Sequence, residues 1–503
     1  MGNDISEIAK TIKMQIEGFE FSPQFSEEGV VVSYSDGTAI VFGLSKVLYS
    51  EIISFSSGAT GIALSLLAES VGIVVLNGTV KEGDKAFRTK RVISVPVGDS
   101  LIGRVIDPLG NPLDKLGPIN SSKFREIEND APSILQRQSV NQPLQTGIKA
   151  IDAMIPIGRG QRELIIGDRN TGKTAIAIDT ILNQKDSGVL CIYVAIGQKS
   201  STVSGIIEVL KNKGAMNYTT VIFSPSNDLP AMQYIAPYAG CAIAEEFMYS
   251  GKDVLIVYDD LSKHAVAYRQ LSLLLKRPPG REAYPGDIFY LHSRLLERSA
   301  KLSDELGGGS MTALPIVETL AGDISAYIPT NIISITDGQI YLETDLFNEG
   351  VKPAINVGLS VSRVGGAAQM PAMKNVASSL RLDLAQYREL LAFSQFSTDI
   401  DSTTKQRLLR GKKLVEILKQ DQYEPMSLAD EVIIIFAGTR GLVDDIKDED
   451  IQRFQKSLLN YVKNNFQSLV NDIMMGKSLD EDRKKQLSIA INSYRSKFFG
   501  KEE

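Results

Sequence analysis

Eight consecutive residues carry the clearest chemical pattern in the sequence. They read Gly-Asp-Arg-Asn-Thr-Gly-Lys-Thr and fit G-x-x-x-x-G-K-[ST], the pattern of a phosphate-binding loop. In such a loop, backbone N–H groups and the start of the next helix surround a polyphosphate. The lysine reaches the terminal phosphates and the last hydroxyl holds Mg²⁺. The predicted binding residues are Gly167, Asp168, Arg169, Asn170, Thr171, Gly172, Lys173 and Thr174.

The segments on both sides of the loop favour this interpretation over a chance match in a glycine-containing turn. The apolar run 164–166 predicts a buried strand, and residues 173–184 are predicted to form a helix. A strand, a glycine loop and a helix in this order are the context that the pattern requires. The sequence therefore predicts a nucleoside triphosphate site with Mg²⁺, and leaves open whether the bound nucleotide is hydrolysed.

Asp259 is predicted to hold the Mg²⁺ together with Thr174, most simply through a water molecule. It ends the apolar run 254–258, which reads as a buried strand, and phosphate-loop proteins place a metal-binding acid at such a strand end. The alternative is an ordinary turn, since strands often end at Asp. The adjacent Asp260 points to the other side of the strand end, so we expect it to serve in a turn or as a helix cap.

Two further polar residues keep their alternatives open at this point. Gln198 follows the predicted strand 189–196, where a hydrolase would position its attacking water. An amide cannot accept the proton, although a Gln orients water in some nucleotidases, and a surface-loop role is equally possible. Arg363 lies in a Ser/Gly-rich loop. Most arginines are solvated surface residues, but one at a domain edge can reach a neighbour's phosphates.

Length and composition set the class of protein. The chain has 503 residues, 43% hydrophobic and 23% charged, which indicates a globular protein of roughly three domains. A formal charge of −6 argues against nucleic acid as the main partner. Cys191, Cys241, His264 and His292 are isolated in the sequence and are predicted to be structural. The sequence contains neither a signal peptide nor an apolar run long enough to cross a membrane.

The predicted fold class is multidomain, with an N-terminal small β-barrel, a central α/β phosphate-loop (RecA-like) domain and a C-terminal α-helical bundle. The predicted boundaries are an N-terminal amphipathic, partner-binding segment at 1–23, the barrel at 24–95, the α/β domain at 96–370 and the helical domain at 371–503. The first segment carries isoleucines at helical spacing over 4–18. The barrel is predicted from several short strands at close spacing, two of them joined by Asp36-Gly37, a strong hairpin signal.

In the central part, strands alternate with helices, which is typical of a mostly parallel sheet covered on both faces. Later strands are predicted at 311–317 and 332–335. Beyond Met370, apolar residues recur at helical spacing, and Gly438 and Gly441 are predicted to break the helices.

Several longer motifs resemble the family of F-type ATP synthase alpha subunits. The resemblance covers nearly the whole chain in order, including the barrel and the helical end. The motifs are Arg-Gly-Gln-Arg-Glu-Leu-Ile-Ile-Gly-Asp-Arg-Asn-Thr-Gly-Lys-Thr at 159–174, Tyr-Asp-Asp-Leu-Ser-Lys at 258–263, Arg-Pro-Pro-Gly-Arg-Glu-Ala-Tyr-Pro-Gly-Asp at 277–287, His-Ser-Arg-Leu-Leu-Glu-Arg at 292–298 and Pro-Ala-Ile-Asn-Val-Gly-Leu-Ser-Val-Ser at 353–362.

The resemblance implies that alpha and beta subunits alternate in a ring of three plus three around a gamma shaft. In this family beta carries the catalytic sites, and alpha binds Mg²⁺ with ATP or ADP without turning it over. The catalytic glutamate of beta falls where this chain has Gln198. Arg363 matches an arginine that enters the adjacent beta site and stabilises the transferring phosphoryl group. The enzyme is then the whole ion-transporting ATPase complex, and the isolated chain is expected to be inactive.

The resemblance also implies partners, a location and an adenine pocket. The N-terminal helix matches the part that binds the delta subunit of the peripheral stalk. The complex is expected at the cytoplasmic face of a bacterial-type cell membrane, or its organelle equivalent, with alpha reaching the membrane only through the membrane sector. By analogy the adenine pocket involves Pro353, Gln420 and Gln422, although Lys352 stands where many relatives have Arg.

Three alternatives follow from the same residues. A catalytic rotary or export ATPase of the same fold should carry Glu at position 198 and a beta-like loop, and this chain has neither. An RNA-translocating hexamer that resembles the transcription termination factor should expose aromatic and basic residues in its N-terminal module. A pure scaffold with a vestigial loop would not bind Mg²⁺-ATP tightly.

Overall fold

The computed structural model describes residues 27–394 and 401–500. The predicted amphipathic helix at 4–18 lies outside the described residues. The chain divides into two compact units, Met1–Ile93 and Ser94–Glu503. Among the described helices, none combines the length and the apolar character needed to cross a membrane.

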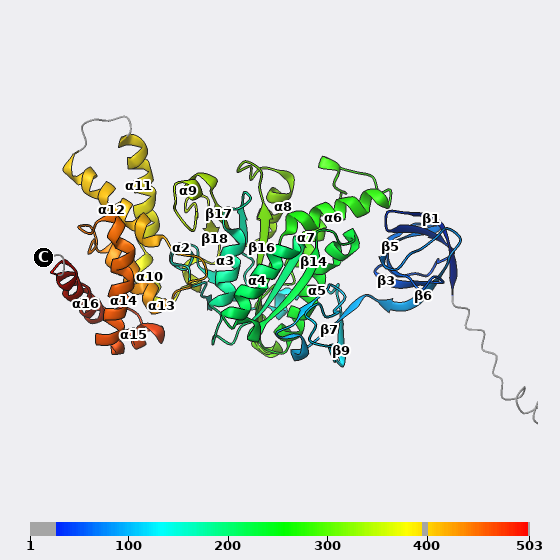
Figure 1. Ribbon diagram of the computed structural model, residues 1–503, viewed down its shortest axis with the longest axis horizontal. Helices are drawn as coiled ribbons and strands as arrows, with labels where there is room; N and C mark the ends of the chain where they lie inside the picture. Colours follow the sequence, from blue (N-terminus) through cyan, green and yellow to red (C-terminus); the bar gives the residue numbers. More distant parts are fainter. Residues whose placement is uncertain (1–26, 395–400, 501–503) are drawn as a thin grey trace, which may run out of the picture. The chain divides into compact units, whose positions relative to one another are not determined.

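The first unit is a closed antiparallel barrel of six strands in the order β1-β2-β5-β4-β3-β6 (Figure 1). The predicted Asp36-Gly37 turn joins β1 to β2, and both residues have the positive φ (47° and 82°) that a tight hairpin requires. Val31, Val41 and Ile73 are almost fully buried inside the barrel. The strands are β1 Glu28–Ser35, β2 Thr38–Phe42, β3 Glu51–Phe55, β4 Thr60–Leu66, β5 Ser70–Asn77 and β6 Lys85–Val92.

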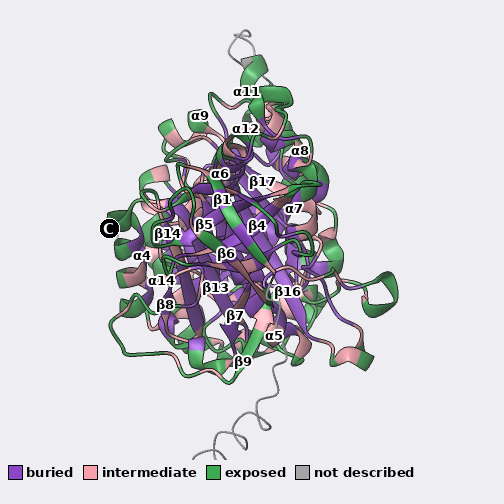
Figure 2. Cartoon of the chain, turned by 90° about the vertical axis from the view of Figure 1, so that its right-hand side faces the viewer, coloured by how far each residue is buried: buried purple, intermediate pink, exposed green. Residues whose placement is uncertain are grey.

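The second unit contains an eight-stranded sheet in the order β18-β17-β12-β16-β15-β13-β14-β8. All neighbours are parallel except β17 and β18. The central strands are buried, whereas the outer surfaces of the helices are exposed (Figure 2). The strands are β8 Val105–Ile106, β12 Leu164–Gly167, β13 Leu190–Gln198, β14 Thr219–Pro225, β15 Asp253–Asp259, β16 Ser310–Glu318, β17 Gly338–Leu342 and β18 Val361–Ser362.

The helices of the sheet region follow its strands, as expected for parallel crossovers. Two short two-stranded sheets, β7 with β9 and β10 with β11, lie beside them. The helices are α2 Lys149–Met154, α3 Lys173–Leu182, α4 Ser200–Asn212, α5 Pro230–Tyr249, α6 Leu261–Leu274, α7 Ile288–Leu296, α8 Tyr327–Ile335 and α9 Thr344–Asn348. The strands of the two short sheets are β7 Ser94–Val97, β9 Lys123–Glu126, β10 Pro143–Leu144 and β11 Ile157–Gly158.

One predicted strand is wrong. Residues 332–335 form the last turn of α8 rather than a strand. Ile328, Ile332 and Ile335 are buried along one face of this helix. The helical spacing of these side chains therefore outweighs the β-propensity of the isoleucine run.

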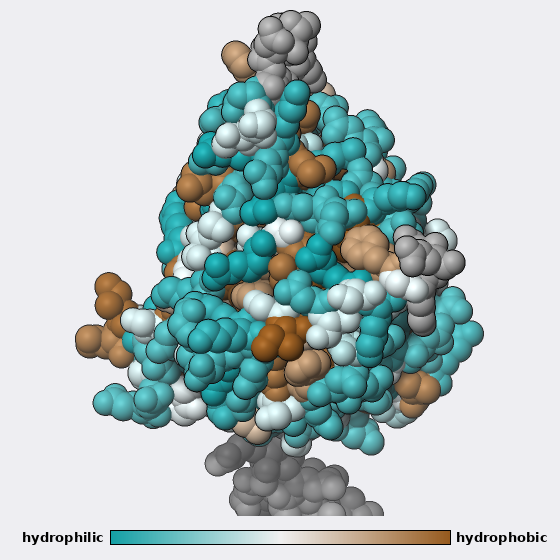
Figure 3. All heavy atoms as spheres, turned by 90° about the vertical axis from the view of Figure 1, so that its left-hand side faces the viewer, coloured by the Kyte–Doolittle hydropathy of each residue, from teal (hydrophilic) through white to brown (hydrophobic). Residues whose placement is uncertain are grey.

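The C-terminal part is helical, with α13 at its centre. Every residue from Leu428 to Gly438 of α13 is buried, and α13 packs against α10, α12, α14 and α15. The face shown in Figure 3 is largely hydrophilic, with scattered hydrophobic residues. The helices are α10 Pro371–Ala377, α11 Leu380–Ser394, α12 Ser402–Leu418, α13 Leu428–Thr439, α14 Ile451–Asn465, α15 Gln467–Met474 and α16 Glu481–Phe499.

Gly438 does not break its helix, contrary to the prediction from the sequence. A Cβ at this position would lie 2.7 Å from Ile417 Cδ1 and 3.0 Å from Leu414 Cδ2. The glycine therefore allows α12 to approach α13 closely. The chain leaves the helix at Gly441, whose φ is +69°.

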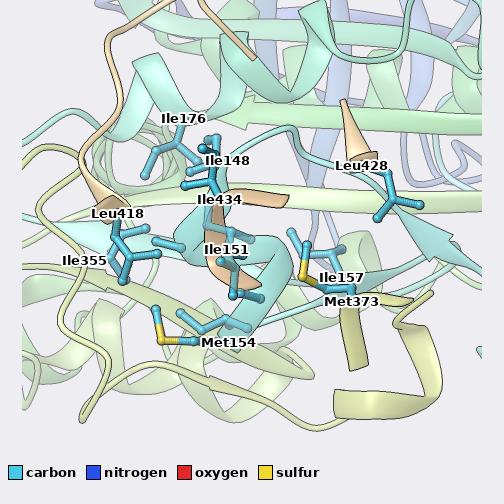
Figure 4. Packing of buried hydrophobic residues seen from close by; sticks show 14 of the residues in the cluster. Ile148, Ile151, Met154, Ile157, Ile176, Ile355, Met373, Leu418, Leu428 and Ile434 are labelled. Carbon is cyan, nitrogen blue, oxygen red and sulfur yellow. The ribbon is translucent and has the colours of Figure 1, made fainter. Parts of the chain in front are cut away.

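The helical part shares one hydrophobic core with the sheet region (Figure 4). In Figure 4, Ile148 and Ile151 lie among Leu418, Leu428 and Ile434. Lys149 adds a polar connection, because its buried ammonium donates to Ile417 O at 2.6 Å and Gln455 Oε1 at 2.9 Å.

All four Cys and His residues are buried, which agrees with the structural role predicted for them. Both cysteines are free thiols. The two histidines meet in space, with His264 Nδ1 3.2 Å from His292 Nε2. Burial lowers the pKa of His264 to about 3 and holds that of His292 well below its ordinary value. Both rings are therefore neutral members of the core.

A buried ion pair joins α5 to the segment after α7. Arg298, 1% exposed, donates from Nε and Nη2 to the two oxygens of Glu245, each at 2.7 Å. Arg125 also donates to Glu245, at 3.0 Å. Removing either partner of such a bidentate pair destabilises the fold, because the remaining charge would be buried without compensation.

We expect Glu245→Ala to lower the free energy of unfolding by about 3–5 kcal/mol, because it leaves the buried charge of Arg298 unpaired. Urea unfolding of the full-length chain measures this change. The matched control is Glu246→Ala, which removes the neighbouring carboxylate from the more exposed pair with Lys123 and should cost less than about 1 kcal/mol. Equal losses in the two variants would contradict the prediction.

Candidate functional site

The phosphate-binding loop connects the centre of the sheet to α3. It begins where β12 ends at Gly167, and Gly172 precedes the helix with φ +102°. A Cβ at Gly167 would lie 2.5 Å from Leu342 O of β17, so only glycine allows the loop this close to the neighbouring strand. The loop's backbone and the N-terminus of α3 thus form an anion-binding geometry.

Asp168 anchors the loop to the segments that follow β16 and β17. Its carboxylate accepts hydrogen bonds from Thr319 Oγ1 at 2.6 Å, Gly322 N at 2.9 Å and Thr344 Oγ1 at 2.9 Å. Burial raises the pKa of this carboxyl, but the hydrogen bonds outweigh burial and hold the pKa below its usual value. Asp168 is therefore ionised, and its side chain holds the loop in place. Arg169 forms an ion pair with Glu318 on the outside of the loop.

Lys173 and Thr174 lie at the start of α3, as their predicted roles require. Lys173 Nζ donates to the carbonyl oxygens of Gly167 and Asp168. Burial lowers the pKa of Lys173, and the carboxylates of Glu318, Asp260 and Asp259 partly oppose that shift. This concentration of negative charge favours binding of Mg²⁺ together with the phosphates.

Asp259 accepts three hydrogen bonds at the end of β15. Its carboxylate accepts from Thr174 Oγ1 at 2.7 Å, Tyr193 OH at 2.8 Å and Gln198 Nε2 at 2.9 Å. Gln198 thus lies against Asp259 and is not a free loop residue. Tyr193 was not singled out from the sequence, where it is one of several residues in an apolar strand, and no sequence signal marks it.

The oxygens of Thr174 and Asp259 suit Mg²⁺, which prefers oxygen ligands and keeps several waters. The Thr174 hydroxyl donates its hydrogen bond to Asp259, so its lone pairs stay available to a metal. In the part of the chain that the structure describes, no group of three or more His, Cys, Asp or Glu side chains could hold a metal alone. A metal here would therefore take its remaining ligands from phosphate oxygens and water.

Asp260 has the capping role expected from the sequence. It precedes α6 and accepts a hydrogen bond from Lys263 N at 2.7 Å. Burial raises the pKa of Asp260 to about 6, and the charge of Lys263 limits the shift.

A pocket beside the loop brings together the residues expected around adenine. Pro353, Gln420 and Gln422 line it, although they are far from the loop in sequence. The Gln420 side chain is engaged within the protein, since Nε2 donates to Gly147 O at 2.7 Å and Oε1 accepts from Lys149 N at 3.1 Å. The remaining lining residues are Ile148, Thr171, Gly172, Ala175, Ile176, Asp179, Phe347, Lys352, Ala354 and Asp421.

Arg363 lies apart from these residues. It follows β18 at the edge of the sheet, is exposed, and does not line the pocket beside the loop. Its backbone N–H donates to Asp337 O at 2.9 Å, which fixes the main chain there. For its guanidinium, the described residues supply no hydrogen-bond or ion-pair partner.

The loop at the end of a central parallel strand, the paired oxygens of Thr174 and Asp259, and the adjacent pocket define a phosphate-loop nucleotide-binding protein. Three known domain families match the chain and identify the family within this class. The beta-barrel domain of the ATP synthase alpha/beta family matches residues 25–90. The nucleotide-binding domain of that family matches 147–362, and the C-terminal domain of the ATP synthase alpha/beta chain matches 369–494.

A full-length relative is the ATP synthase subunit alpha of Caldanaerobacter subterraneus subsp. tengcongensis. It is 58% identical over 505 residues, covering 100% of both chains. The chain therefore belongs to the ATP synthase alpha/beta family, and within it to the alpha subunits of F-type ATP synthases. Such a subunit is one part of a hetero-oligomeric ATPase complex, which argues against an RNA translocase or an unrelated scaffold.

We expect Lys173→Ala to weaken the binding of Mg²⁺-ATP by roughly 10- to 100-fold, since it removes a charge-assisted contact to phosphate. Equilibrium dialysis with the full-length chain measures the dissociation constant. Lys185→Ala, an exposed lysine beyond the end of α3, is the control and should leave it unchanged. An unaltered affinity in the Lys173 variant would refute the role of the loop.

We expect Thr174→Val to remove most of the increase in ATP affinity that Mg²⁺ produces, because valine keeps the shape of threonine without its oxygen. The measurement compares ATP binding with Mg²⁺ and with a chelator. Thr171→Val makes the same change in the loop, at a hydroxyl that donates to Asp168 O, and should retain the Mg²⁺ dependence. If both variants respond to Mg²⁺ as the wild type does, Thr174 is not a metal ligand.

Proposed function

We propose that this alpha subunit holds Mg²⁺ with ATP or ADP at its own loop without hydrolysing it. The observation that carries the proposal is the amide of Gln198 beside Asp259. A general base must accept the proton of the attacking water, and an amide cannot. The nucleotide would then act as a bound structural ligand, with Thr174 and Asp259 holding the metal, the latter through water.

Three carboxylates near the loop support the same conclusion, because each is already engaged. Asp259 accepts three hydrogen bonds. Asp260 caps α6, and Glu318 pairs with Arg169. None of these groups is poised as a general base.

We further propose that Arg363 acts in trans, on the catalytic site of an adjacent beta subunit. An exposed guanidinium on a fixed backbone at a sheet edge is suited to reach another chain's phosphates, and arginine is the usual residue for this task. Because Arg363 does not line this chain's own pocket, its charge is available to a neighbour.

The proposed assembly is the alternating ring of three alpha and three beta subunits around gamma, with residues 1–23 meeting delta and the peripheral stalk. We also propose the domain boundaries given above, at 24–95, 96–370 and 371–503. In this arrangement the subunit is peripheral, at the cytoplasmic face of a bacterial-type membrane, and assists ATP synthesis and hydrolysis coupled to ion transport. Steady ATP hydrolysis by the chain alone would instead favour a catalytic ATPase of the same fold.

We expect Arg363→Ala to reduce ATP turnover of the assembled complex on the order of 10³-fold, since a phosphoryl-stabilising arginine contributes about that much. Assembly and nucleotide binding by alpha should persist. Arg91→Ala, which removes an exposed arginine of the barrel, is the control. Near-normal turnover in an assembled Arg363→Ala complex would refute the proposal.

A further inference from the structure

One carboxyl group in the pocket beside the loop has no role in the account above. Asp179 lies on α3, seven residues after Gly172 and three after Ile176, so it shares the pocket-lining side of the helix with them. It is 6% exposed. Its Oδ1 atom is buried without a hydrogen-bond partner.

A buried carboxyl oxygen without a partner is costly, because it loses its hydrogen bonds to water. Burial is also the main reason why the pKa of Asp179 rises to about 7, against the opposing backbone hydrogen bond from Tyr423 and the charge of Lys213. A ligand with an N–H group at this position would remove that cost.

The other polar groups of the pocket are either engaged or exposed. Gln420 is held by Gly147 and Lys149, and the Thr171 hydroxyl donates to Asp168 O. Asp421 and Gln422 are exposed. Asp179 therefore combines burial with a free acceptor.

The apolar surroundings suit a flat base. Ile148, Ile176, Phe347 and Pro353 line the same pocket, and pockets of this kind obtain specificity from a few polar groups. The exocyclic amino group of adenine is an N–H donor, whereas the equivalent position of hypoxanthine or guanine carries a carbonyl acceptor.

We propose that Asp179 is a specificity-determining residue of this nucleotide site, whose free carboxyl oxygen accepts a hydrogen bond from the adenine amino group. A purine with a carbonyl at that position would place two acceptors against each other and bind more weakly. The inference rests on the proposed nucleotide site and adds the group that selects the base.

The test compares Mg²⁺-ATP with Mg²⁺-ITP, whose base carries a carbonyl in place of the C6 amino group and a hydrogen on the adjacent N1. Equilibrium dialysis with the full-length wild-type chain should show preference for ATP. The Asp179→Asn side chain has the same shape as the wild-type side chain. Its amide can turn either its oxygen or its NH₂ group toward the base, so it can bond to either nucleotide. We expect the ATP preference to fall about tenfold, the size of one hydrogen bond to a charged group.

The matched control is Asp482→Asn, which makes the same change at an exposed carboxylate of α16 that does not line the pocket, and should preserve the wild-type preference. A second readout is pH. The protonated Asp179 carboxyl can donate to the ITP carbonyl, so the wild-type preference should fall as pH drops through about 7. Lys213, Tyr423, Asp421 and Lys352 are the charged or titratable groups around it. The Asp179→Asn variant should lack this pH dependence.

The outcomes separate this inference from the proposed function. If Asp179→Asn binds ATP tightly and keeps the wild-type preference, Asp179 does not select the base, and the nucleotide site stands. If the wild-type chain binds neither nucleotide, the site itself is refuted and the inference with it.

Discussion

The hydrogen bonds that meet at Asp259 depend on the register of the parallel sheet, and the functional region depends on them in turn. β13 pairs with β15 so that Ala195 lies opposite Asp259, which brings Gln198 to the same edge as Thr174 of the loop. Because carboxyl ends of parallel strands meet at one edge, a shift of one residue in β15 would turn Asp259 to the other face. The register of the sheet therefore determines whether Asp259 and the loop meet at all.

The helical part of the chain supplies one wall of the pocket beside the loop. Gln420 lies in the segment after α12, and its backbone N–H donates to the carbonyl oxygen of Lys352 at 2.9 Å. The buried Lys149 ties the same segment to α2, and burial lowers its pKa to about 8. The pocket beside the loop is thus lined by both the sheet region and the helical part, whereas the loop itself lies between β12 and α3.

The phosphate loop, the buried strands and the fold class were predictable because they depend on local patterns. The errors have a tertiary cause. Residues 332–335 carry β-branched side chains, yet their burial on one side of α8 decides the conformation. Gly438 looked like a helix breaker, but close packing against α12 uses its missing side chain. Neither the neighbour of α8 nor that of α13 can be read from the residues themselves.

The sequence by itself determined the phosphate loop, the acid after a buried strand, the amide at Gln198 and the family, because each is a local pattern of residue types. Only the tertiary structure decided that Gln198 and Tyr193 both bond to Asp259, that Gln420 is engaged within the protein, and that Asp179 has a free buried oxygen. These facts concern which atoms remain unsatisfied after packing, and packing joins segments that are distant in the chain.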